Sequence, residues 1–522
     1  MNFRLFMYYL SCVLFCLNGL AISETIQGIV YHDMNQNYQR DANEPGIAEV
    51  LVSNKTEVTK TDNDGHYSLQ IHGEDIIFVI KPAGYALPLN ENNLPQFYYI
   101  HTPEGSPPSK YKGLDPTGPL PQQIDFPLYE DNIGDDFEVV VFSDPQPRNE
   151  KEINYVRDDV LSELIGTSSV CGIVLGDIMY DDLSLYEYYC QVLGQTGIPF
   201  YHVPGNHDMN YDAADDLHSL ETFKRHFGPP YYGFQYGKVH FIALDVVDYL
   251  GYNVEGNPHY QGKIGEQQLH WLENYLKFIP DDHLIVLNMH IPFYSFIGSH
   301  VTVRVTDRDL LFNLVKDRSQ ILSLAGHMHM IEHQFLGTEQ DWQGEQPLHQ
   351  IICGAVSGSW WNGPPDIRGI PVADQRDGAP NGYHIFTFQG NLYQERYVPA
   401  QFGDTYQLRI SIPTGIIEKS QLDSINIVVN IFDGNEKSRV TYQIDDRPPL
   451  IMSRQKMIDP FVRTLHDNYQ EYYLSWIKPR LSNHIWTAPF PNEPDAGTHT
   501  ITVTATNQWG KSFRTSQIFE IK

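Results

Sequence analysis

Cysteine and positive charge are scarce in this 522-residue chain, and long apolar runs are confined to its start. The 5 cysteines are Cys12 and Cys16 near the N-terminus and Cys171, Cys190 and Cys353 further along. Three cysteines beyond the N-terminal segment are too few, and odd in number, for a disulfide framework. Cys171 and Cys353 stand in apolar runs typical of strands, so we expect them to be buried free thiols.

The charge balance is strongly acidic. Asp and Glu number 65 against 35 Lys and Arg, which gives a formal net charge of −30. A phosphate backbone would be repelled by such a chain, and no run of Lys and Arg offers a local exception. We therefore expect no nucleic-acid polymer as a partner. The apolar content of 41% is ample for packed cores and excludes a disordered protein.

The first residues predict a secretory signal peptide over residues 1–23. Arg4 precedes an apolar run over residues 5–17, and Ala21-Ile22-Ser23 places small residues where a signal peptidase cleaves. The alternatives are a membrane anchor, disfavoured because the run is shorter than the ~20 residues that a span needs, and lipid attachment at Cys12. The prediction implies a secreted protein, periplasmic in a Gram-negative bacterium, with no transmembrane segment in the mature chain.

Three parts follow from the pattern of apolar residues. Residues 24–128 alternate at period two and end in a Pro-rich linker or wrapping segment over residues 102–121. Residues 135–399 alternate strands with helices, which predicts an α/β domain. Residues 402–522 return to period two and predict a second β-rich domain.

Several individual elements can also be predicted. Residues 61–65 form a turn signal, and residues 66–70 should return as the second strand of a hairpin. In the α/β part, the clearest helices are residues 150–165 and 266–278. These elements frame the motifs that carry chemistry.

Five short motifs with metal-ligand side chains occur in order in the middle of the chain. They are Asp144-Pro145-Gln146, Gly176-Asp177, Gly205-Asn206-His207-Asp208, Met289-His290 and Gly326-His327-Met328-His329. Each follows an apolar run typical of a strand, and strand ends of an α/β domain place such groups at one edge of the sheet. Each motif alone is as easily a turn or a surface loop. Together they predict a site for two metal ions.

The motifs resemble those of the calcineurin-like metallophosphoesterase superfamily, whose pattern is D-x-H, GD, GNH-D/E, a lone H and GHxH. The resemblance covers about residues 135–399, and four of the five motifs match. The whole chain is similar to a three-part bacterial subgroup, with related segments over residues 354–361 and 377–383. It implies a central β-sandwich flanked by helices, with N-terminal and C-terminal all-β domains of the immunoglobulin or prealbumin-like kind.

The resemblance also implies a role for each motif residue. Asp144, Gln146 and His329 would hold the first metal, Asp177 would bridge both metals, and the second metal would be held by Asn206, His290 and His327. His207 would face the phosphate or the leaving group as an acid or a charge stabiliser, and Asp208 would orient it. The implied reaction is hydrolysis of a small phosphoric ester through in-line attack of a hydroxide that bridges the metals.

Gln146 departs from the family pattern, which has His there. A carbonyl oxygen suits harder ions than an imidazole does, so we expect Mn²⁺ to be favoured among Mn²⁺, Mg²⁺, Zn²⁺ and iron. The alternative is a degenerate site in a non-catalytic protein that binds a cell surface or a glycan. A protein phosphatase is a third hypothesis, which the predicted signal peptide and the acidic charge disfavour.

Two secondary sites complete the predictions. One is a set of oxygen-bearing side chains with the spacing of a calcium loop: Asp33, Asn35, Asn37, Gln39, Asp41 and Glu44. They would either hold a structural Ca²⁺ or form a plain acidic turn. Trp360 and Trp361 follow the last metal motif and would either stack on the substrate or belong to the core. The sequence leaves open the oligomeric state and the choice among monoester, diester and pyrophosphate.

Overall fold

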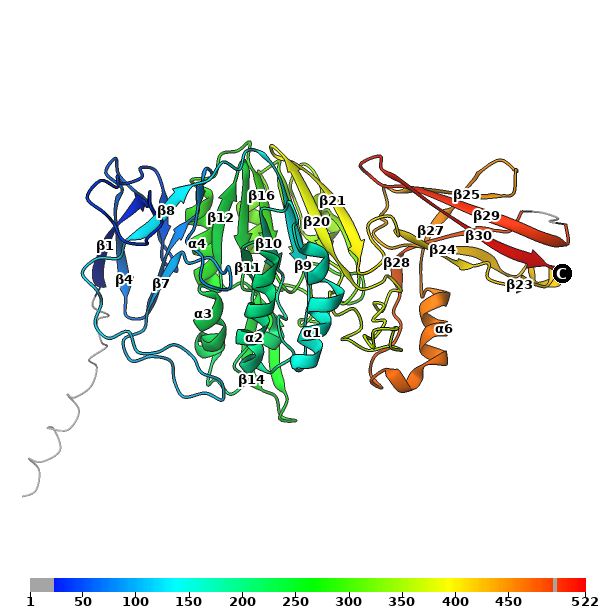
Figure 1. The fold of residues 1–522 in the computed structure, drawn as a ribbon, viewed down its shortest axis with the longest axis horizontal. Helices are drawn as coiled ribbons and strands as arrows, with labels where there is room; N and C mark the ends of the chain where they lie inside the picture. The colour runs from blue at the N-terminus through cyan, green and yellow to red at the C-terminus, as the bar shows by residue number, and fades with distance from the viewer. Residues whose placement is uncertain (1–22, 492–494) are drawn as a thin grey trace, which may run out of the picture.

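The computed structural model describes residues 23–491 and 495–522. The predicted signal peptide falls almost entirely outside these residues and stays a prediction. Three groups of sheets follow one another along the long axis of the molecule (Figure 1). Within the described residues, no helix is both long and apolar enough to cross a membrane.

The N-terminal group contains two four-stranded sheets. Their strands, in the orders β4-β1-β8-β6 and β3-β2-β5-β7, are β1 (Ser23–His32), β2 (Leu51–Ser53), β3 (Val58–Lys60), β4 (His66–His72), β5 (Asp75–Ile80), β6 (Tyr85–Ala86), β7 (Tyr98–His101) and β8 (Phe126–Glu130). The predicted hairpin around residues 61–65 is wrong, because β3 pairs with β2 while β4 pairs with β1. The turn carries the chain from one sheet to the other.

The central group is a sandwich of two mixed sheets. The first sheet has the order β11-β10-β9-β20-β21 and contains β9 (Asp136–Phe142), β10 (Cys171–Val174), β11 (Phe200–His202), β20 (Gly382–Gln389) and β21 (Leu392–Pro399). The second has the order β12-β13-β16-β17-β19-β18 and contains β12 (Tyr232–Tyr236), β13 (Val239–Ala243), β16 (Leu284–Asn288), β17 (Ile321–Ala325), β18 (Glu332–Leu336) and β19 (Leu348–Ile352). A small hairpin, β14 (Val247–Tyr252) and β15 (Pro258–Gly262), stands apart from both sheets.

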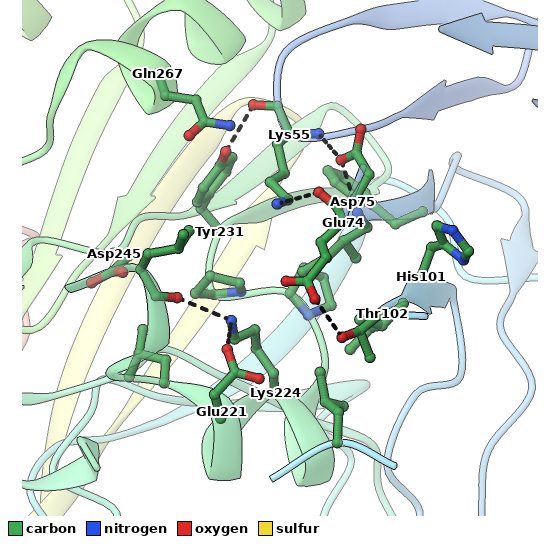
Figure 2. A pocket seen from close by; sticks show the side chains of 18 of the residues that line it. Lys55, Glu74, Asp75, His101, Thr102, Glu221, Lys224, Tyr231, Asp245 and Gln267 are labelled. Carbon is green, nitrogen blue, oxygen red and sulfur yellow. Dashed lines mark hydrogen bonds and ion pairs between the residues drawn. The ribbon is translucent and has the colours of Figure 1, made fainter. Parts of the chain in front are cut away.

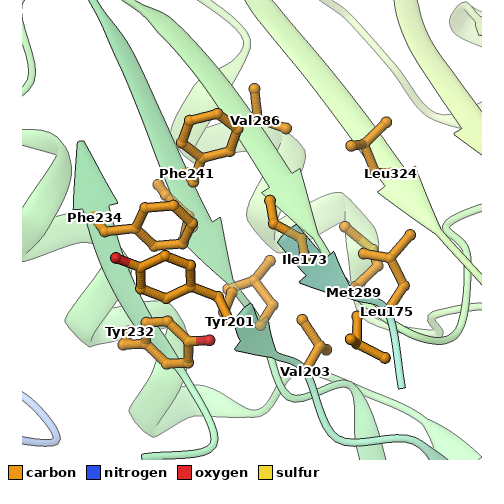
Figure 3. Close-up of a cluster of buried hydrophobic side chains, with 14 of the residues drawn as sticks. Ile173, Leu175, Tyr201, Val203, Tyr232, Phe234, Phe241, Val286, Met289 and Leu324 are labelled. Carbon is orange, nitrogen blue, oxygen red and sulfur yellow. The ribbon is translucent and has the colours of Figure 1, made fainter. Parts of the chain in front are cut away.

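Apolar side chains of the two sheets interdigitate to form the core. Figure 3 shows Tyr201 from one sheet beside Phe234 and Phe241 from the other, and the Tyr201 and Phe234 rings stack 3.7 Å apart. The parallel strands β9, β10, β13, β16 and β17 are almost entirely buried, which explains their near-continuous apolar sequences. This rigid core fixes the loops at the ends of those strands.

Helices cover the outer faces of the sandwich. They are α1 (Glu150–Asp159), α2 (Tyr186–Leu193), α3 (Glu221–Phe227), α4 (Glu266–Leu276) and α5 (Arg308–Val315). Helix α1 begins at Asn149, whose side chain accepts a hydrogen bond from the Glu152 amide, and it ends earlier than predicted because a 3-10 turn follows over Leu161–Leu164. The predicted helix over residues 266–278 is confirmed as α4, two residues shorter.

The C-terminal group contains two further sheets and one helix. The sheets have the orders β22-β24-β28-β27 and β23-β30-β29-β25-β26, and the helix is α6 (Pro460–Asn468). Their strands are β22 (Leu408–Ile412), β23 (Ile416–Ile417), β24 (Asn426–Ile431), β25 (Arg439–Ile444), β26 (Leu450–Ile451), β27 (Ser453–Met457), β28 (Ser482–Pro489), β29 (Gly497–Thr506) and β30 (Ser512–Ile521). The immunoglobulin or prealbumin-like character of the outer sheets stays a prediction.

The N-terminal sheets are joined to the central sandwich. Just after β5, the Lys81 carbonyl accepts a hydrogen bond of 2.9 Å from the Gln235 amide at the edge strand β12. A cavity of about 140 Å³ lies nearby between the two parts, where Glu74 and Asp75 face Glu221 and Lys224 (Figure 2). None of the predicted site residues is among its lining residues.

Lys81 should make the stability of this junction depend on pH. Burial lowers the pKa of Lys81 from 10.5 to about 8, although its ammonium group donates to the Gln235 carbonyl at 3.0 Å. Between these pH values the unfolded chain therefore holds more protons than the folded protein, so the free energy of unfolding should rise with pH. Below this window Lys81 is charged in both states, and the folded protein is destabilised by the whole free energy of burying that charge. At pH 7 we expect Lys81→Met to raise the free energy of unfolding by about 2 kcal/mol.

The measurement is denaturant unfolding of both proteins from pH 7 to 10.5. The advantage of the variant should shrink as the pH rises, while Lys60→Met, at an exposed lysine, should show no such trend. An advantage that stays constant with pH would contradict the assignment to Lys81.

Candidate metal centre

All seven predicted metal ligands lie just beyond the C-terminal ends of parallel strands. Asp144 and Gln146 follow β9, Asp177 follows β10, and Asn206 follows β11. The remaining ligands come from the facing sheet, after β16 and β17, and are His290, His327 and His329. The two sheets therefore deliver their ligands to one shared edge of the sandwich.

His290 is the centre of one half of this cluster. Its Nδ1 atom donates to the Leu175 carbonyl at 2.8 Å. Its Nε2 atom lies 3.1 Å from Asn206 Oδ1, 3.2 Å from Asp177 Oδ1 and 3.1 Å from His327 Nδ1. A single N–H cannot satisfy three acceptors that converge in this way, whereas a divalent cation binds such donors together. The arrangement therefore fits a metal ion.

The electrostatics favour positive charge at the same point. Burial opposes protonation of His290, yet Asp177 and Asp144 raise the pKa of its imidazole to about 9. Burial also raises the pKa of Asp144 to about 7, with Asp177 adding to that shift. A negative field this deep in the protein favours a bound cation as well as a proton.

The second half of the cluster is built around Asp144 and His329. His329 donates from Nδ1 to the Gly358 carbonyl at 2.6 Å, so its Nε2 atom faces Asp144 Oδ1, 3.5 Å away, with a lone pair. Burial lowers the pKa of His329 to about 3, which keeps the ring neutral. A neutral nitrogen and a carboxylate oxygen that face each other across 3.5 Å suit a metal ion as donors.

Gln146 completes this half. Its side-chain nitrogen donates to Asp177 Oδ2 at 3.1 Å, which leaves the carbonyl oxygen Oε1 buried and without a hydrogen-bond partner. An unpartnered buried oxygen costs roughly 1–3 kcal/mol, and a cation would remove that cost. The residue that departs from the family pattern thus still offers a ligand atom to the centre.

The glycines of the motifs allow the ligand loops to touch. A Cβ atom on Gly205 would lie 2.3 Å from Asp177 Oδ1, and one on Gly326 would lie 2.8 Å from Asp144 Oδ2. Neither contact is sterically allowed, so both positions require glycine.

Much of the loop backbone is also strained. The predicted ligands with a positive φ angle are Asp144, Gln146, Asp177, His327 and His329. Such conformations cost about 1–3 kcal/mol each and concentrate at functional sites.

His207 lies in the open part of the centre and is not one of the converging ligands. Its amide donates to Asp177 Oδ1 at 2.9 Å, and its ring stacks on Tyr180 with ring centres 4.8 Å apart. His207 and the predicted ligand His327 are only partly buried, whereas the other six predicted ligands are buried. Although burial opposes it, Asp177 and Asp181 raise the pKa of His207 to about 9, so the ring carries a proton to offer.

The predicted role of Asp208 is wrong. His207 Nδ1 contacts Asp181 Oδ1 at 2.6 Å, so Asp181 is the residue that orients the imidazole. Asp208 instead accepts hydrogen bonds from the Ile178 amide at 3.0 Å, the Gly205 amide at 2.8 Å and the Tyr186 hydroxyl at 2.8 Å. The carboxylate of Asp208 points into the protein and ties two ligand loops together.

The two tryptophans differ in their surroundings. Trp361 is buried and donates from its indole to the Pro145 carbonyl at 2.9 Å, so it belongs to the core beneath the first ligand loop. Of the two alternatives left open for Trp361, the structure therefore favours the core position. Trp360 stacks on His329 at 3.7 Å and meets Trp476, half-exposed, edge-on at 4.6 Å. This pair forms an aromatic wall beside the first metal position.

Residues from outside the central part also contact the metal centre, and the five motifs do not predict them. Tyr111, in the Pro-rich segment, donates its hydroxyl to the Asp181 carbonyl at 3.0 Å. Ser109 and Lys110 bind the Asp212 carboxylate from the same segment. The wrapping prediction for residues 102–121 thus describes a strap that supports the loop holding His207. Trp476 comes from the C-terminal part. Neither Tyr111 nor Trp476 belongs to a motif whose spacing could have predicted its place near the site.

The predicted calcium loop is folded onto itself. Asp33 is fully buried and accepts from the Tyr38 amide at 2.8 Å, and Glu44 accepts from the Met34 amide at 2.9 Å. Asp41 accepts from the side-chain amides of Asn35, at 2.7 Å, and Asn37, at 3.2 Å. The Gln39 amide donates to Asn37 Oδ1 at 2.8 Å. Five of the six predicted side chains take part in these hydrogen bonds, Gln39 contributes only its backbone amide, and bound Ca²⁺ stays a prediction.

Family models match most of the chain. Residues 137–330 match the model described as calcineurin-like phosphoesterase. Residues 34–112 match the N terminal of calcineurin-like phosphoesterase, and residues 351–513 match the C terminal of calcineurin-like phosphoesterase. The three matches follow the same order as the three groups of sheets.

Curated relatives match over about a third of the chain. The probable glycerophosphodiester phosphodiesterase GpdQ of Arcobacter nitrofigilis is 26% identical over 175 residues, which are 32% of this chain and 58% of that protein. The 3',5'-cyclic adenosine monophosphate phosphodiesterase CpdA of Escherichia coli is 28% identical over 183 residues, 34% of this chain and 58% of that one. The chain thus spans less than two thirds of the length of these relatives.

A solved structure similar to this chain is a dimetal phosphatase from Danio rerio. It is 14% identical and has a TM-score of 0.34, and the match covers 50% of this chain and 98% of that one.

Replacing Gln146 by His should change the metal preference of the centre. An imidazole nitrogen would take the place of the unpartnered carbonyl oxygen, so Gln146→His should bind Zn²⁺ roughly tenfold more tightly and gain less for Mn²⁺. Metal titration of the metal-depleted protein, with Gln191→His on the exposed face of α2 as the control, measures both affinities. Equal affinities in the wild type and Gln146→His would show that this position does not bind metal.

Asp181 and Asp208 should be separable by mutation. Asp181→Asn removes the charge that holds His207, so kcat should fall by roughly 10- to 100-fold with an unchanged unfolding temperature. Asp208→Asn weakens a buried cluster of hydrogen bonds, so it should lower the free energy of unfolding by about 2 kcal/mol. Paired kinetics and thermal unfolding test this. A loss of stability in Asp181→Asn with no loss of kcat would reverse the assignment.

Proposed function

Because the chain belongs to the calcineurin-like phosphoesterase family, we propose that it hydrolyses a phosphoric ester with the help of two divalent cations. The observation that carries the proposal is the convergence of His290 Nε2 on Asn206, Asp177 and His327, all within 3.2 Å. A similar pair, His329 and Asp144, stands on the other side of Asp177. Two donor clusters that share one carboxylate suit two cations and a phosphate between them.

The residues that would hold the cations fall into two sets. Asp144, Gln146 and His329 form the first set and Asn206, His290 and His327 the second, with Asp177 between them. Bound there, the cations would neutralise phosphate charge and lower the pKa of a water molecule that attacks phosphorus. Mn²⁺ is favoured because four of the seven donors are oxygen atoms of Asp, Asn and Gln.

His207 would complete the reaction from the protein side. Asp181 engages Nδ1, so Nε2 is the atom free to donate a proton to the departing oxygen. The raised pKa of His207 keeps that proton available, and Tyr180 fixes the plane of the ring. The strap residue Tyr111 supports Asp181 from behind, which ties the position of the acid to the N-terminal part.

We propose that the substrate is a small phosphodiester. The relatives named as phosphodiesterases support this substrate class. The net charge of −30 disfavours a polyanionic polymer. On the side of the first metal position, Trp360 and Trp476 form an apolar wall, and the Arg376 guanidinium lies 5.7 Å from the Trp360 ring. The half-exposed indole of Trp476 suits contact with the second organic group of a diester, which a monoester lacks.

Turnover by the metal-loaded protein tests the proposal. The full chain is depleted of metal, loaded with Mn²⁺ and assayed with bis(p-nitrophenyl) phosphate and p-nitrophenyl phosphate. We expect the diester to be hydrolysed with the higher kcat/KM. Asp177→Asn should lower the rate about 1000-fold or more because both cations lose a shared ligand.

Asp282→Asn, at an exposed carboxylate, is the matched control and should keep full activity. No turnover with Mn²⁺, Mg²⁺, Zn²⁺ or iron would favour the alternative of a surface- or glycan-binding protein. A higher kcat/KM for the monoester would leave phosphoester hydrolysis in place and overturn the choice of substrate.

A further inference from the structure

A second set of ligand-type side chains, which contains none of the motif residues, lies where the central sandwich meets the C-terminal part. It consists of His333 on β18, Glu395 on β21 and Asp433, which follows β24. Their ligand atoms all lie within 4.8 Å of one another. The three residues come from both central sheets and from the C-terminal part, which faces β20 and β21 in Figure 1. The function proposed above uses none of them.

The imidazole of His333 is held so that one nitrogen faces the carboxylates. Its Nδ1 atom contacts His349 Nε2 at 3.0 Å, and His349 Nδ1 contacts the Tyr393 hydroxyl at 2.7 Å. His333 Nε2 lies 2.6 Å from Asp433 Oδ1. Metal-binding histidines are oriented in this way, with the second ring nitrogen engaged by a neighbour.

Glu395 is oriented in the same manner. His384 Nε2 accepts from the Gly354 amide at 3.0 Å, so its proton is on Nδ1, which donates to Glu395 Oε1. The other carboxylate oxygen, Oε2, is buried, and no N–H group or hydroxyl donates to it. The Glu395 side chain is fully buried, so bulk water does not reach this oxygen.

The two carboxylates face each other. Glu395 and Asp433 lie within hydrogen-bonding reach of one another, and buried like charges at this distance require a proton or a cation between them. A cavity of about 20 Å³ adjoins both residues, with Gln407 and Ser438 also in its lining. That volume holds one water molecule. Three protein donors and one water molecule make a four-coordinate site.

We propose that His333, Glu395 and Asp433 bind a divalent cation, with Zn²⁺ the best match, separate from the phosphoesterase centre. One neutral imidazole and two carboxylates balance the charge of the ion and offer borderline nitrogen and hard oxygen donors. Because its ligands come from both central sheets and the C-terminal part, the ion would cross-link all three. Its role is structural, and it does not depend on the proposed reaction.

Zinc content measures this directly. The full-length wild type, Asp433→Asn and Glu395→Gln are saturated with Zn²⁺, freed of excess and analysed for zinc per chain. Both variants should retain one equivalent less than the wild type, and Zn²⁺ should raise their unfolding temperature less. Asp404→Asn, an exposed carboxylate beside Arg396, is the control and should match the wild type. Asp177→Asn should lose zinc independently, so a double variant with Asp433→Asn should show both losses.

A measurement without variants keeps the proposal testable if either substitution prevents folding. Crystals of the wild type soaked in Zn²⁺ should show an anomalous peak between His333, Glu395 and Asp433. Equal zinc content in the wild type and both variants, or no peak at this position, would overturn the site and show that Glu395 and Asp433 share a proton.

Discussion

The structure depends on one electrostatic constraint, the burial of facing lone pairs where two sheets meet. The imidazoles of His290 and His329 face the carboxylates of Asp177 and Asp144 at the ends of strands that the core holds rigidly. This close approach strains the ligand loops, most of whose ligands adopt positive φ angles and whose glycines leave no room for a Cβ atom. Such a cluster favours positive charge at its centre, and divalent cations would supply that charge together with the chemistry of phosphoester hydrolysis.

The outer parts of the chain contribute to the centre through single contacts. The strap brings Tyr111 to the backbone of Asp181, and the C-terminal part brings Trp476 to Trp360. The cluster of His333, Glu395 and Asp433 also gathers carboxylates and an imidazole away from solvent, at the junction with the C-terminal part. It has fewer ligands than the main centre. Flanking domains of this kind can therefore shape the substrate site and fix the sandwich, and they need not act only as binding modules.

The sequence predicts those features that depend on local pattern. Buried parallel strands such as β9 and β16 have apolar runs, and ligands placed after them must share one sheet edge, so their convergence is predictable. The residue that orients His207 cannot be predicted in this way. Asp181 and Asp208 lie on two different loops, and their spacing does not show which carboxylate points toward the imidazole. The predicted pairing of β3 with β4 is wrong for a related reason, since a turn signal does not show which sheet each strand joins. Trp476 and Asp433 reach their partners only through tertiary contacts between parts distant in sequence.

The central claim is that two cations share the carboxylate of Asp177, and electron paramagnetic resonance of the Mn²⁺-loaded protein tests it most directly. Two Mn²⁺ ions bridged by one carboxylate, about 3.5–4 Å apart, are magnetically coupled. The account predicts the spectrum of a coupled pair in the wild type and its loss in Asp177→Asn. A wild-type spectrum that contains only isolated Mn²⁺ ions at saturating metal would contradict it.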